Sequence, residues 1–478
     1  MTVAKTLPPR FRNDNEGTFG QYTISVRWPI IVQDAVDDVT KELDLLAASD
    51  IVGKKEIIEE GENVREGLIA LRREILDGAP LSLFTSTECE LASVPGSFNE
   101  YLTSFPERPT WHNAEWLFSE VYLYRRINVI FRTQTSQHWR DYDVFYRLKQ
   151  SSFKASYYGV VELAMRHKAL SADLRKVDKT QESDQHALRI LFEEFLDTSL
   201  WGNATDLSLL TMLSLEELKT IQGSAVRMAS KSKIVVNDLD KTWNALISQD
   251  PTKSVRVDFV LDNSGFELYT DLIFAAFLLG SKLAHKCVFH GKDIPYMVSD
   301  VTERDFNLIL ENISDREFFS AAKGNAEESQ ALDFFVSDIK NYIKTGAITF
   351  ECDSFWTTNL DFWNIDPSEK KYHGAKVYQD LLSSDLVIFK GDLNYRKLTG
   401  DRTWSRTTPW EDAIGPMATN GLTLVSLRTC KADVQVALPE GLDEKLCSEW
   451  DKDHPGRGSW WSSSGKWAVI CFADSKKH

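Results

Sequence analysis

The sequence predicts an α/β protein, helical in its first half and built on a mostly parallel sheet in its second. In the first half, apolar residues recur at three-to-four spacing, with no convincing alternating strand between them. In the second half, short β-branched segments alternate with helical ones, the pattern of βαβ units, whose strands pair in parallel. The chain of 478 residues is long for one domain. We therefore predict a helical domain, 1–230, and an α/β domain, 231–478, with the boundary near Lys231.

Helices are predicted throughout the first half. Trp28-Pro29 begins the first long helix, because proline is tolerated in the first turn, and Gly78 follows the end of the second. Further helices are predicted at 113–133, 156–173, 188–200 and 214–230. The acidic, serine-rich segment from Lys176 to Gln185 is predicted to be a solvated loop.

The stretch from Val255 to Asp300 predicts the central βαβ unit. Val255 to Leu261 has the β-branched and apolar composition of a buried strand. Phe266 to Leu283 has helical apolar spacing, and Cys287 to His290 is a second short strand. The polar turn Asp262-Asn263-Ser264-Gly265 lies at the carboxyl end of the first strand. Ligands of parallel sheets bind just outside such carboxyl ends, so this turn is the first candidate for a site.

Three oxygen donors are predicted at that edge: Asp262 and Asn263 in the turn, and Asp300 after the next strand. Carboxylate and amide oxygens suit Mg²⁺ or Mn²⁺ better than a thiophilic metal. Two ordinary explanations stay open. The turn could serve backbone geometry alone, with Gly265 supplying a permissive conformation. Asp300 to Glu303 also fits a helix N-cap followed by an acidic residue.

Basic residues follow two of the later predicted strands, which lie at 347–350, 386–389, 422–427 and 467–472. Lys390 to Lys397 follows the second of these strands, and Arg428 to Lys431 follows the third. In a parallel sheet these cations share the edge with Asp262 and Asn263. A divalent metal beside lysine and arginine suits phosphoryl transfer, because the metal activates water and the cations stabilise charge in the transition state. The alternative is solvated loop charge.

Two segments of the helical half are candidates for a cover over the same site. The Tyr-Leu-Tyr-Arg-Arg segment places Arg125 and Arg126 on one predicted helix. The Ser-Leu-Trp-Gly-Asn segment interrupts a helix at a glycine and supplies Asn203 and Asp206. In the first segment the tyrosines could simply pack in the core while the arginines are solvated. In the second, the glycine could simply end one helix before the next begins.

Composition excludes several classes of partner. The formal net charge of −16 makes duplex nucleic acid and anionic membrane poor partners for the surface as a whole. The N-terminus lacks the apolar core of a signal peptide, and the longest apolar run of the central helix, Leu272 to Leu279, is too short to span a bilayer. Six cysteines without a Cys-x-x-Cys pair indicate a reducing compartment. We expect a cytoplasmic protein, with a nuclear presence and the oligomeric state left open.

Four motifs resemble a known family when taken together. They are Leu261 to Glu267, Ile294 to Asp300, Phe389 to Arg402, and Arg428-Thr429-Cys430-Lys431. This set is similar to the metal-dependent damage-control phosphatases, first catalogued as a domain of unknown function. The Arg-Thr-x-Lys element marks the subgroup of sugar-phosphate phosphatases, which was also described as acidic-residue methyltransferases. The resemblance covers nearly the whole chain, and the Lys-Gly-Asp-Leu-Asn-Tyr-Arg-Lys string is its most specific part.

The resemblance implies a helical N-terminal domain beside a Rossmann-like, three-layer α/β/α domain. It implies that Asp262, Asn263 and Asp300 bind Mn²⁺, or Ni²⁺, Co²⁺ or Mg²⁺ in its place, with Asp262 and Asn263 also catalytic. The substrate-binding residues implied are Glu267, Lys390, Asp392, Asn394, Tyr395, Arg396, Arg428 and Lys431. The implied substrates are small phosphorylated metabolites such as fructose 1-phosphate and fructose 6-phosphate, with a damage-control role in hexose phosphate metabolism.

Three other hypotheses remain at this point. An S-adenosylmethionine-dependent protein carboxyl (glutamate) methyltransferase is compatible with the fold, but the first strand lacks a glycine-rich cofactor loop, and clustered cations suit phosphate better than a sulfonium. A non-catalytic phosphometabolite-binding protein would bind without turnover. A covalent mechanism with Asp262 as the nucleophile is disfavoured, because Asn263-Ser264 stands where a second aspartate would be needed, and we favour attack by water.

Overall fold

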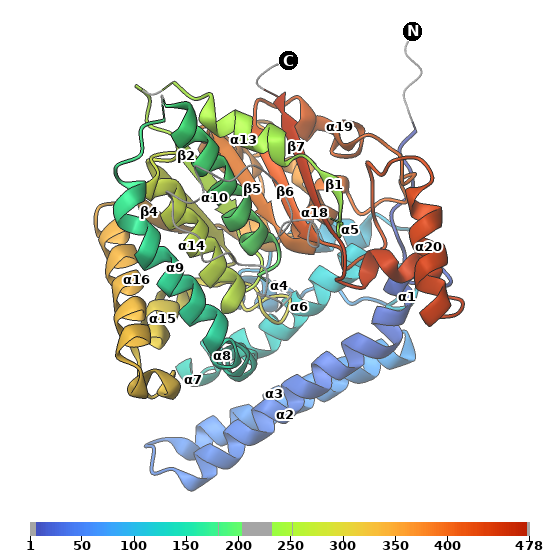
Figure 1. The fold of residues 1–478 in the computed structure, drawn as a ribbon. Coiled ribbons are helices and arrows are strands. Elements are labelled where there is room, and N and C mark those ends of the chain that lie inside the picture. Colours follow the sequence, from blue (N-terminus) through green and yellow to red (C-terminus); the bar gives the residue numbers. More distant parts are fainter. Residues whose placement is uncertain (1–5, 180, 203–231, 251, 476–478) are drawn as a thin grey trace.

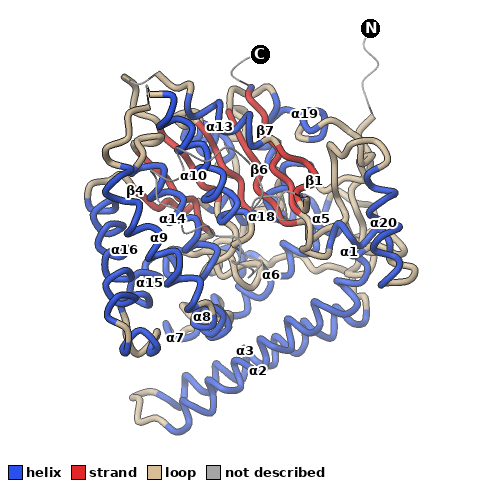
Figure 2. Tube along the Cα trace, viewed as in Figure 1, coloured by secondary structure: helices blue, strands red, loops and turns tan. Residues whose placement is uncertain are grey.

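The computed structural model describes residues 6–179, 181–202, 232–250 and 252–475. In these residues one sheet of seven strands forms the centre of the molecule, in the order β1-β7-β6-β5-β2-β3-β4 (Figures 1 and 2). The strands are β1 (Ile234–Asn237), β2 (Arg256–Val260), β3 (Lys286–Gly291), β4 (Ile348–Cys352), β5 (Leu386–Lys390), β6 (Thr423–Thr429) and β7 (Ala468–Asp474). Neighbouring strands pair in parallel except β6 and β7, which are antiparallel. The predicted α/β class and mostly parallel sheet are confirmed.

The central strands are apolar along their whole length because both faces of the sheet are covered. Val257 and Phe259 of β2 face one core, and Val260 faces the other. The first face is covered by α9 (Tyr157–Leu174), α10 (Glu182–Leu200) and α14 (Phe266–Gly280), which lie in front of the sheet in Figure 1. The second core includes residues of α17 (Gly374–Leu381), α18 (Gly391–Thr399) and α19 (Trp410–Ala413). The three-layer arrangement is confirmed.

The remaining helices of the α/β half lie around this sandwich. They are α13 (Leu239–Ile247), α15 (Glu303–Ser314), α16 (Ala326–Lys344) and α20 (Leu442–Asp453). α14 is buried on nearly every side, between the sheet and the layer of α9 and α10, which is why its sequence is apolar almost all round. It ends at Gly280, three residues before the predicted end.

The first half of the chain is helical, as predicted. Its other helices are α1 (Phe19–Tyr22), α2 (Trp28–Ala48), α3 (Lys54–Asp77), α4 (Ser86–Leu91), α5 (Ser97–Thr103), α6 (Trp116–Arg132), α7 (Gln137–Arg140) and α8 (Tyr146–Ala155). The long helices α2 and α3 form an antiparallel hairpin that projects at the bottom of Figure 1. The predicted helix 214–230, together with Asn203 and Asp206, lies outside the described residues.

One loop prediction was wrong in part. The segment from Lys176 to Gln185 was expected to be a loop, but α10 begins at Glu182, within it. Glu182 and Asp184 lie in the first turn of α10, where negative charge interacts favourably with the helix dipole. Acidic composition therefore marked the start of a helix at this position.

The N-terminal helices pack on the loops at the carboxyl edge of the sheet. Their core, centred on α2, α3 and α6, also contains Ile294 and Tyr296 from the loop after β3, Leu393 from α18 and Ala432 from the loop after β6. The carboxylate of Asp433 accepts hydrogen bonds from Phe19 N and Gly20 N, each at 2.9 Å, and so caps α1. By contrast, α9 and α10 belong to the core of the sheet. The first half thus contributes to two cores, and the domain boundary near Lys231 stays a prediction.

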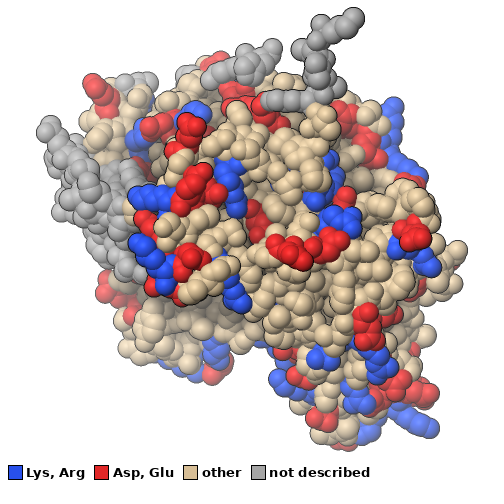
Figure 3. Space-filling view, turned by 90° about the vertical axis from the view of Figure 1, so that its right-hand side faces the viewer, with Lys and Arg blue, Asp and Glu red and all other residues tan. Residues whose placement is uncertain are grey.

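The surface is polar and mixed in charge. Acidic and basic side chains are interspersed on the face shown in Figure 3. Among the residues that the structure describes, no helix combines the length and apolar character needed to cross a membrane.

A buried ion triad joins α8 to α15. The ammonium of Lys149 lies 3.0 Å from Asp143 Oδ2 and 2.8 Å from Asp305 Oδ2, and all three side chains are at most 6% exposed. Asp305 also accepts hydrogen bonds from Thr302 N and Thr302 Oγ1, which begin α15. The start of α15, three residues after Asp300, is therefore held by a helix of the N-terminal half.

We predict that Lys149→Met costs about 3–5 kcal/mol of unfolding free energy, because it leaves two buried carboxylates without their cation. Urea denaturation followed by tryptophan fluorescence measures the loss. Lys154→Met on the same helix is the matched control: its side chain is exposed, so the change should stay within about 0.5 kcal/mol. Equal small losses in both variants would contradict the assignment of the triad.

Candidate functional site

The structure brings Asp262, Asn263 and Asp300 together at the carboxyl edge of the sheet. β2 and β3 end side by side, and the loops that follow them continue to pair. Ser264 N donates to Ser299 O at 2.7 Å, and Val301 N donates to Asp262 O at 3.0 Å, forming a short antiparallel bridge between Asn263 and Asp300. The two loops therefore present their side chains next to each other, as the parallel pairing of their strands predicted.

Hydrogen bonds orient the amide of Asn263. Its Nδ2 donates to Asp262 Oδ2 and to Glu267 Oε2, both at 2.7 Å. Its Oδ1 accepts a hydrogen bond of 2.5 Å from Ser299 Oγ. The amide nitrogen thus faces two carboxylates, and the amide oxygen faces the residue that precedes Asp300.

The carboxylates of this cluster are short of positive charge. Burial raises the pKa of Asp262 well above its ordinary value, and the nearby charges of Glu267 and Asp300 raise it further. Burial also raises the pKa of Asp300, to about 6, although the Lys292 ammonium opposes the shift. Asp300 Oδ2 has no hydrogen-bond partner among the described residues, and Lys292 Nζ stands 3.4 Å from it. A bound cation would relieve this repulsion.

Gly391 allows the next strand to approach the same cluster. It begins α18 directly after β5 and has a φ of +81°. A Cβ atom at this position would lie 1.9 Å from Asp262 Oδ2. Because no side chain fits there, the glycine of the Lys-Gly-Asp sequence is required for the start of α18 to sit against Asp262.

These residues fit a divalent metal. The donors are hard oxygen atoms, two of the groups are buried acids with raised pKa values, and one buried oxygen, Asp300 Oδ2, has no hydrogen bond from any described residue. Asp262, Asn263 and Asp300 are the residues that could hold the ion.

A second group with metal-ligand chemistry lies between the sheet and α17. Ligand atoms of Asp258, His290 and Asp380 lie within 4.8 Å of one another. Arg256 already neutralises them, donating to Asp258 at 2.8 and 2.7 Å and to Asp380 at 3.0 Å. Burial acts to raise the pKa of Asp258, but the bonds from His290 and Arg256 outweigh it and hold that pKa below its ordinary value. An ion-paired carboxylate of this kind is a poorer metal ligand than the cluster at the edge.

The group of Asp258, His290 and Asp380 was not predicted from the sequence. Its signal was an aspartate and a histidine within the buried parts of two adjacent strands. Because Asp258 pairs in register with Val288 and Val260 with His290, the two polar side chains lie on neighbouring strands and bond at 2.8 Å. Polar side chains in buried strands need hydrogen-bond or ionic partners, because burying them unpaired is costly.

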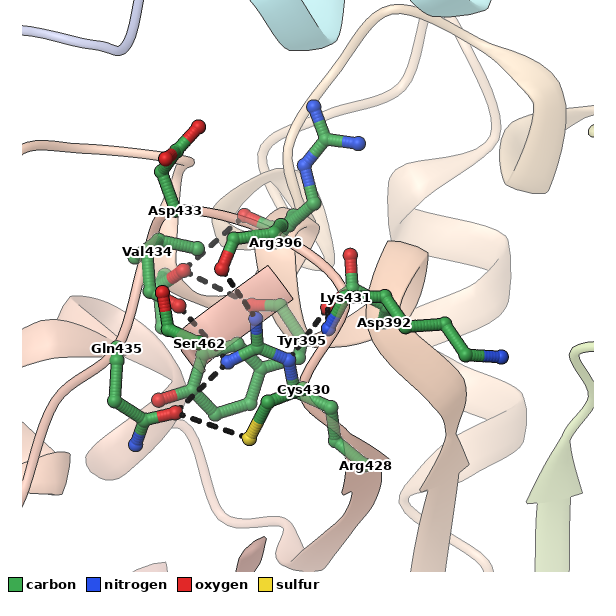
Figure 4. Close-up of polar contacts among 12 residues, drawn as sticks. Asp392, Tyr395, Arg396, Arg428, Cys430, Lys431, Asp433, Val434, Gln435 and Ser462 are labelled. Carbon is green, nitrogen blue, oxygen red and sulfur yellow. Dashed lines mark hydrogen bonds and ion pairs between the residues drawn. The ribbon is translucent and has the colours of Figure 1, made fainter. Parts of the chain in front are cut away.

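Three of the predicted phosphate-binding cations are paired with acids. Lys390 binds Asp271 at 2.6 Å and Glu267 at 3.2 Å. Arg396 pairs with Glu120 and Asp401, and its guanidinium stacks 3.8 Å from the centre of the Trp116 ring. Arg428 is fully buried and donates from Nε to Asp392 Oδ1 at 2.6 Å (Figure 4). Their charges therefore hold the edge of the sheet together.

Lys431 differs from these three. It is half-buried, and its side chain has no ion pair among the described residues. Its backbone N donates to Asp392 Oδ1 at 3.0 Å, so the carboxylate that binds Arg428 also fixes the Lys431 backbone. In Figure 4 its ammonium points away from the Arg428 group. The positive charge of Lys431 lowers the pKa of Asp262, which places it near the acidic cluster.

Two other predicted substrate residues make structural contacts. Asn394 Nδ2 donates to the carbonyl oxygens of Val260, Leu261 and Lys390 and so caps the end of β2. Tyr395 is buried, and its OH accepts a hydrogen bond of 3.1 Å from Val436 N.

The two predicted cover arginines point to other partners. Arg125 is fully buried and donates to Thr357 Oγ1 at 2.7 Å and Thr357 O at 3.2 Å. Arg126 pairs with Glu88 at 3.0 Å and lies over the Phe84 ring. Arg125 therefore joins α6 to the α/β half, and Arg126 joins it to α4. A cover role for either one stays a prediction.

A cleft of about 300 Å³ opens elsewhere, between α2, α7, α8 and α15. It is lined by Glu42, His138, Asp141, Tyr142, Asp143, Tyr146, Arg147 and Arg304. None of the predicted site residues lines it. Most of its charges are already in ion pairs, as Arg147 is with Glu42 in the cleft and with Asp38 outside it. We therefore assign the candidate site to the edge of the sheet.

Comparison with known proteins gives a consistent result. Residues 23–446 match the model of the damage-control phosphatase ARMT1-like domain. Relatives that carry the name damage-control phosphatase ARMT1 include proteins of Danio rerio, Bos taurus and Homo sapiens. They are 32%, 34% and 30% identical to this chain, and the alignments cover 99%, 95% and 98% of it and 99%, 96% and 98% of the relatives. Because the family model spans most of the sequence, the chain belongs to the damage-control phosphatase ARMT1-like family.

Proposed function

We propose that this protein is a metal-dependent phosphatase of small phosphorylated sugars. The observation that carries the proposal is the juxtaposition of a buried acidic cluster, in which the pKa values of Asp262 and Asp300 are raised, with a half-buried lysine that has no ion pair among the described residues. Asp262, Asn263 and Asp300 are the proposed metal ligands, and Lys431 is the proposed phosphate anchor. Family membership supports the phosphatase chemistry, since the relatives carry that activity in their name.

The protein residues have separable roles in this proposal. A divalent metal supplies Lewis-acid activation of phosphate and of water when it is bound. Lys431 binds a phosphate oxygen through a charge-assisted hydrogen bond. Asp392 fixes the Lys431 backbone and is itself held by the buried Arg428. Glu267 fixes the amide of Asn263.

The finer assignments follow the family resemblance. Fructose 1-phosphate and fructose 6-phosphate are the proposed substrates, and Mn²⁺ is the proposed metal, with Ni²⁺, Co²⁺ and Mg²⁺ as alternatives. The donor set supports a hard divalent ion in general. A purified-protein screen of these metals against these sugar phosphates, scored by phosphate release, tests both assignments. Transfer of a labelled methyl group to protein carboxylates without phosphate release would favour the methyltransferase alternative instead.

We predict that Mn²⁺ raises the thermal unfolding temperature more at about pH 7.5 than at about pH 5.5, because metal binding requires deprotonated ligands. The sign follows from Asp300, whose pKa is raised to about 6. Protons compete with the metal below that value. Without metal, the stability contributed by the protonated carboxyl is present at low pH and is lost as the pH rises through 6.

Two variants locate the ion in the same thermal assay. Asp300→Asn should abolish the Mn²⁺ shift, whereas Asp380→Asn should retain it. The reverse result would move the metal to Asp258, His290 and Asp380.

We predict that Lys431→Ala lowers kcat/KM for fructose 1-phosphate by about 10- to 100-fold, the effect of losing one charged hydrogen bond. The Mn²⁺-induced thermal shift should be unchanged. Lys431→Arg should recover only part of the activity, because a guanidinium differs from an ammonium in shape and donor geometry.

Lys466→Ala is the matched control for this lysine. Lys466 is exposed and follows Gly465, whose backbone N donates to the carbonyl oxygen of Cys430, the residue before Lys431, at 2.8 Å. Its removal should leave kcat/KM unchanged. Equal losses in the two alanine variants would show a general electrostatic effect and would remove Lys431 from the site.

A further inference from the structure

The ammonium of Lys390 joins three parts of the chain beneath the candidate site. Lys390 is the last residue of β5, and its side chain is 1% exposed. Its Nζ lies 2.6 Å from Asp271 Oδ1, 2.7 Å from Ser199 O and 3.2 Å from Glu267 Oε1. One buried cation therefore binds two carboxylates of α14 and the last turn of α10.

Asp271 completes this arrangement. It lies four residues after Glu267, so both carboxylates project from the same face of α14. Its Oδ1 also accepts a hydrogen bond of 2.6 Å from Ser199 Oγ. The strongest contact of Lys390 is with Asp271, and the longer contact with Glu267 leaves the other oxygen of Glu267 free to bind elsewhere.

The end of α10 also presses directly on the first turn of α14. A Cβ atom at Gly202 would lie 2.4 Å from Thr270 Oγ1 and 3.1 Å from Glu267 Cα. Only a glycine lets the two helices approach this closely. Glu267 is thus held by backbone packing on one side and by Lys390 on the other.

The position of Glu267 in turn fixes the side chain of Asn263. Glu267 Oε2 accepts a hydrogen bond of 2.7 Å from Asn263 Nδ2. Because the amide nitrogen is bound there, Oδ1 is left facing Ser299, at 2.5 Å. The orientation of the proposed ligand oxygen therefore depends on where the Glu267 carboxylate sits.

We infer that Asp271 is a positioning residue for the metal site, acting through Lys390 and Glu267 on the amide of Asn263. The inference rests on the proposed function, in which Asn263 is a metal ligand. Without the charge of Asp271, Lys390 retains Glu267 as its sole carboxylate partner among the described residues. The ammonium then draws Glu267 away from Asn263 Nδ2, and the amide loses the partner that sets its orientation. Substituting a residue that orients a metal ligand typically weakens the binding of the metal.

The test is the affinity of the substrate-free, full-length protein for Mn²⁺, measured by calorimetry. Asp271→Asn keeps the size of the side chain and should weaken Mn²⁺ binding about 10- to 100-fold. Phosphatase activity should return when Mn²⁺ is raised to saturation, with the KM for fructose 1-phosphate unchanged. Asp338→Asn is the matched control, since this carboxylate in α16 pairs with His167 and Arg175 away from the site. It should bind Mn²⁺ as the unaltered protein does.

A double-mutant cycle tests the route through Lys390. If Asp271 acts through Lys390, the combined Asp271→Asn and Lys390→Met variant should bind Mn²⁺ no more weakly than Lys390→Met alone. Additive losses would overturn the proposed route. An unchanged affinity in folded Asp271→Asn protein would overturn the inference itself. If Asp271→Asn fails to fold, Ser199→Ala is the substitute, because it removes one hydrogen bond to Asp271. It should weaken Mn²⁺ binding severalfold. An unchanged Mn²⁺ affinity in Ser199→Ala would also overturn the inference.

The outcome also separates this inference from the proposed function. If the unaltered protein binds Mn²⁺ and Asp300→Asn does not, the proposed metal site stands whatever Asp271→Asn does. If neither the unaltered protein nor Asp300→Asn binds Mn²⁺, or if both bind it equally, the proposed metal site fails and the inference about Asp271 fails with it.

Discussion

The concentration of buried negative charge at the carboxyl edge of β2 is the constraint on which the rest of the structure depends. Asp262, Glu267 and Asp300 lie within interaction range of one another, and burial makes the ionisation of Asp262 and of Asp300 unfavourable. Two buried lysines, Lys292 and Lys390, and the amide of Asn263 partly compensate this negative charge. These contacts hold the cluster together and leave it acidic enough to attract a divalent ion.

The N-terminal helices are organised by the same edge. Asp433 in the loop after β6 caps α1, Glu120 of α6 pairs with Arg396 of α18, and Lys149 of α8 binds Asp305 at the start of α15. Each contact joins a helix of the first half to a loop or helix beside the site. The helices before α9 thus pack on the loops at the carboxyl edge, and their proposed role is to exclude water from a phosphoryl-transfer site.

The basic residues show why a charge count alone does not define a phosphate site. Lys390, Arg396, Arg428 and Lys431 look equivalent in the sequence, as four cations after two strands. In the structure the first three are buried against acids, and burying an unpaired charge would be costly. Of these four, only Lys431 is half-buried and has no acidic partner within the described part of the chain. The paired cations hold the loops around the site, and the proposed phosphate anchor is Lys431.

The sequence by itself determined the fold class, the strands β2 to β7 of the described sheet and the candidate metal ligands, whereas β1 was not predicted. Strand composition and helical spacing are local properties, and parallel pairing necessarily brings the residues after β2 and β3 to one edge. Asp262, Asn263 and Asp300 could therefore be grouped before any coordinates were known. The start of α10 was missed because acidic residues suit both a solvated loop and the first turn of a helix.

Only the tertiary structure decided which polar groups pair with which. Lys390 binds Ser199, 191 residues away, and Arg396 binds Glu120, 276 residues away. The Asp258 and His290 pair depends on strand register, and the role of Asp271 depends on the close approach of α10 to α14. Such pairings are set by packing between distant segments, so local patterns carry no information about them. The candidate ligands could be predicted because they depend on local patterns. The residues that position them could not, because their contacts depend on packing between distant segments.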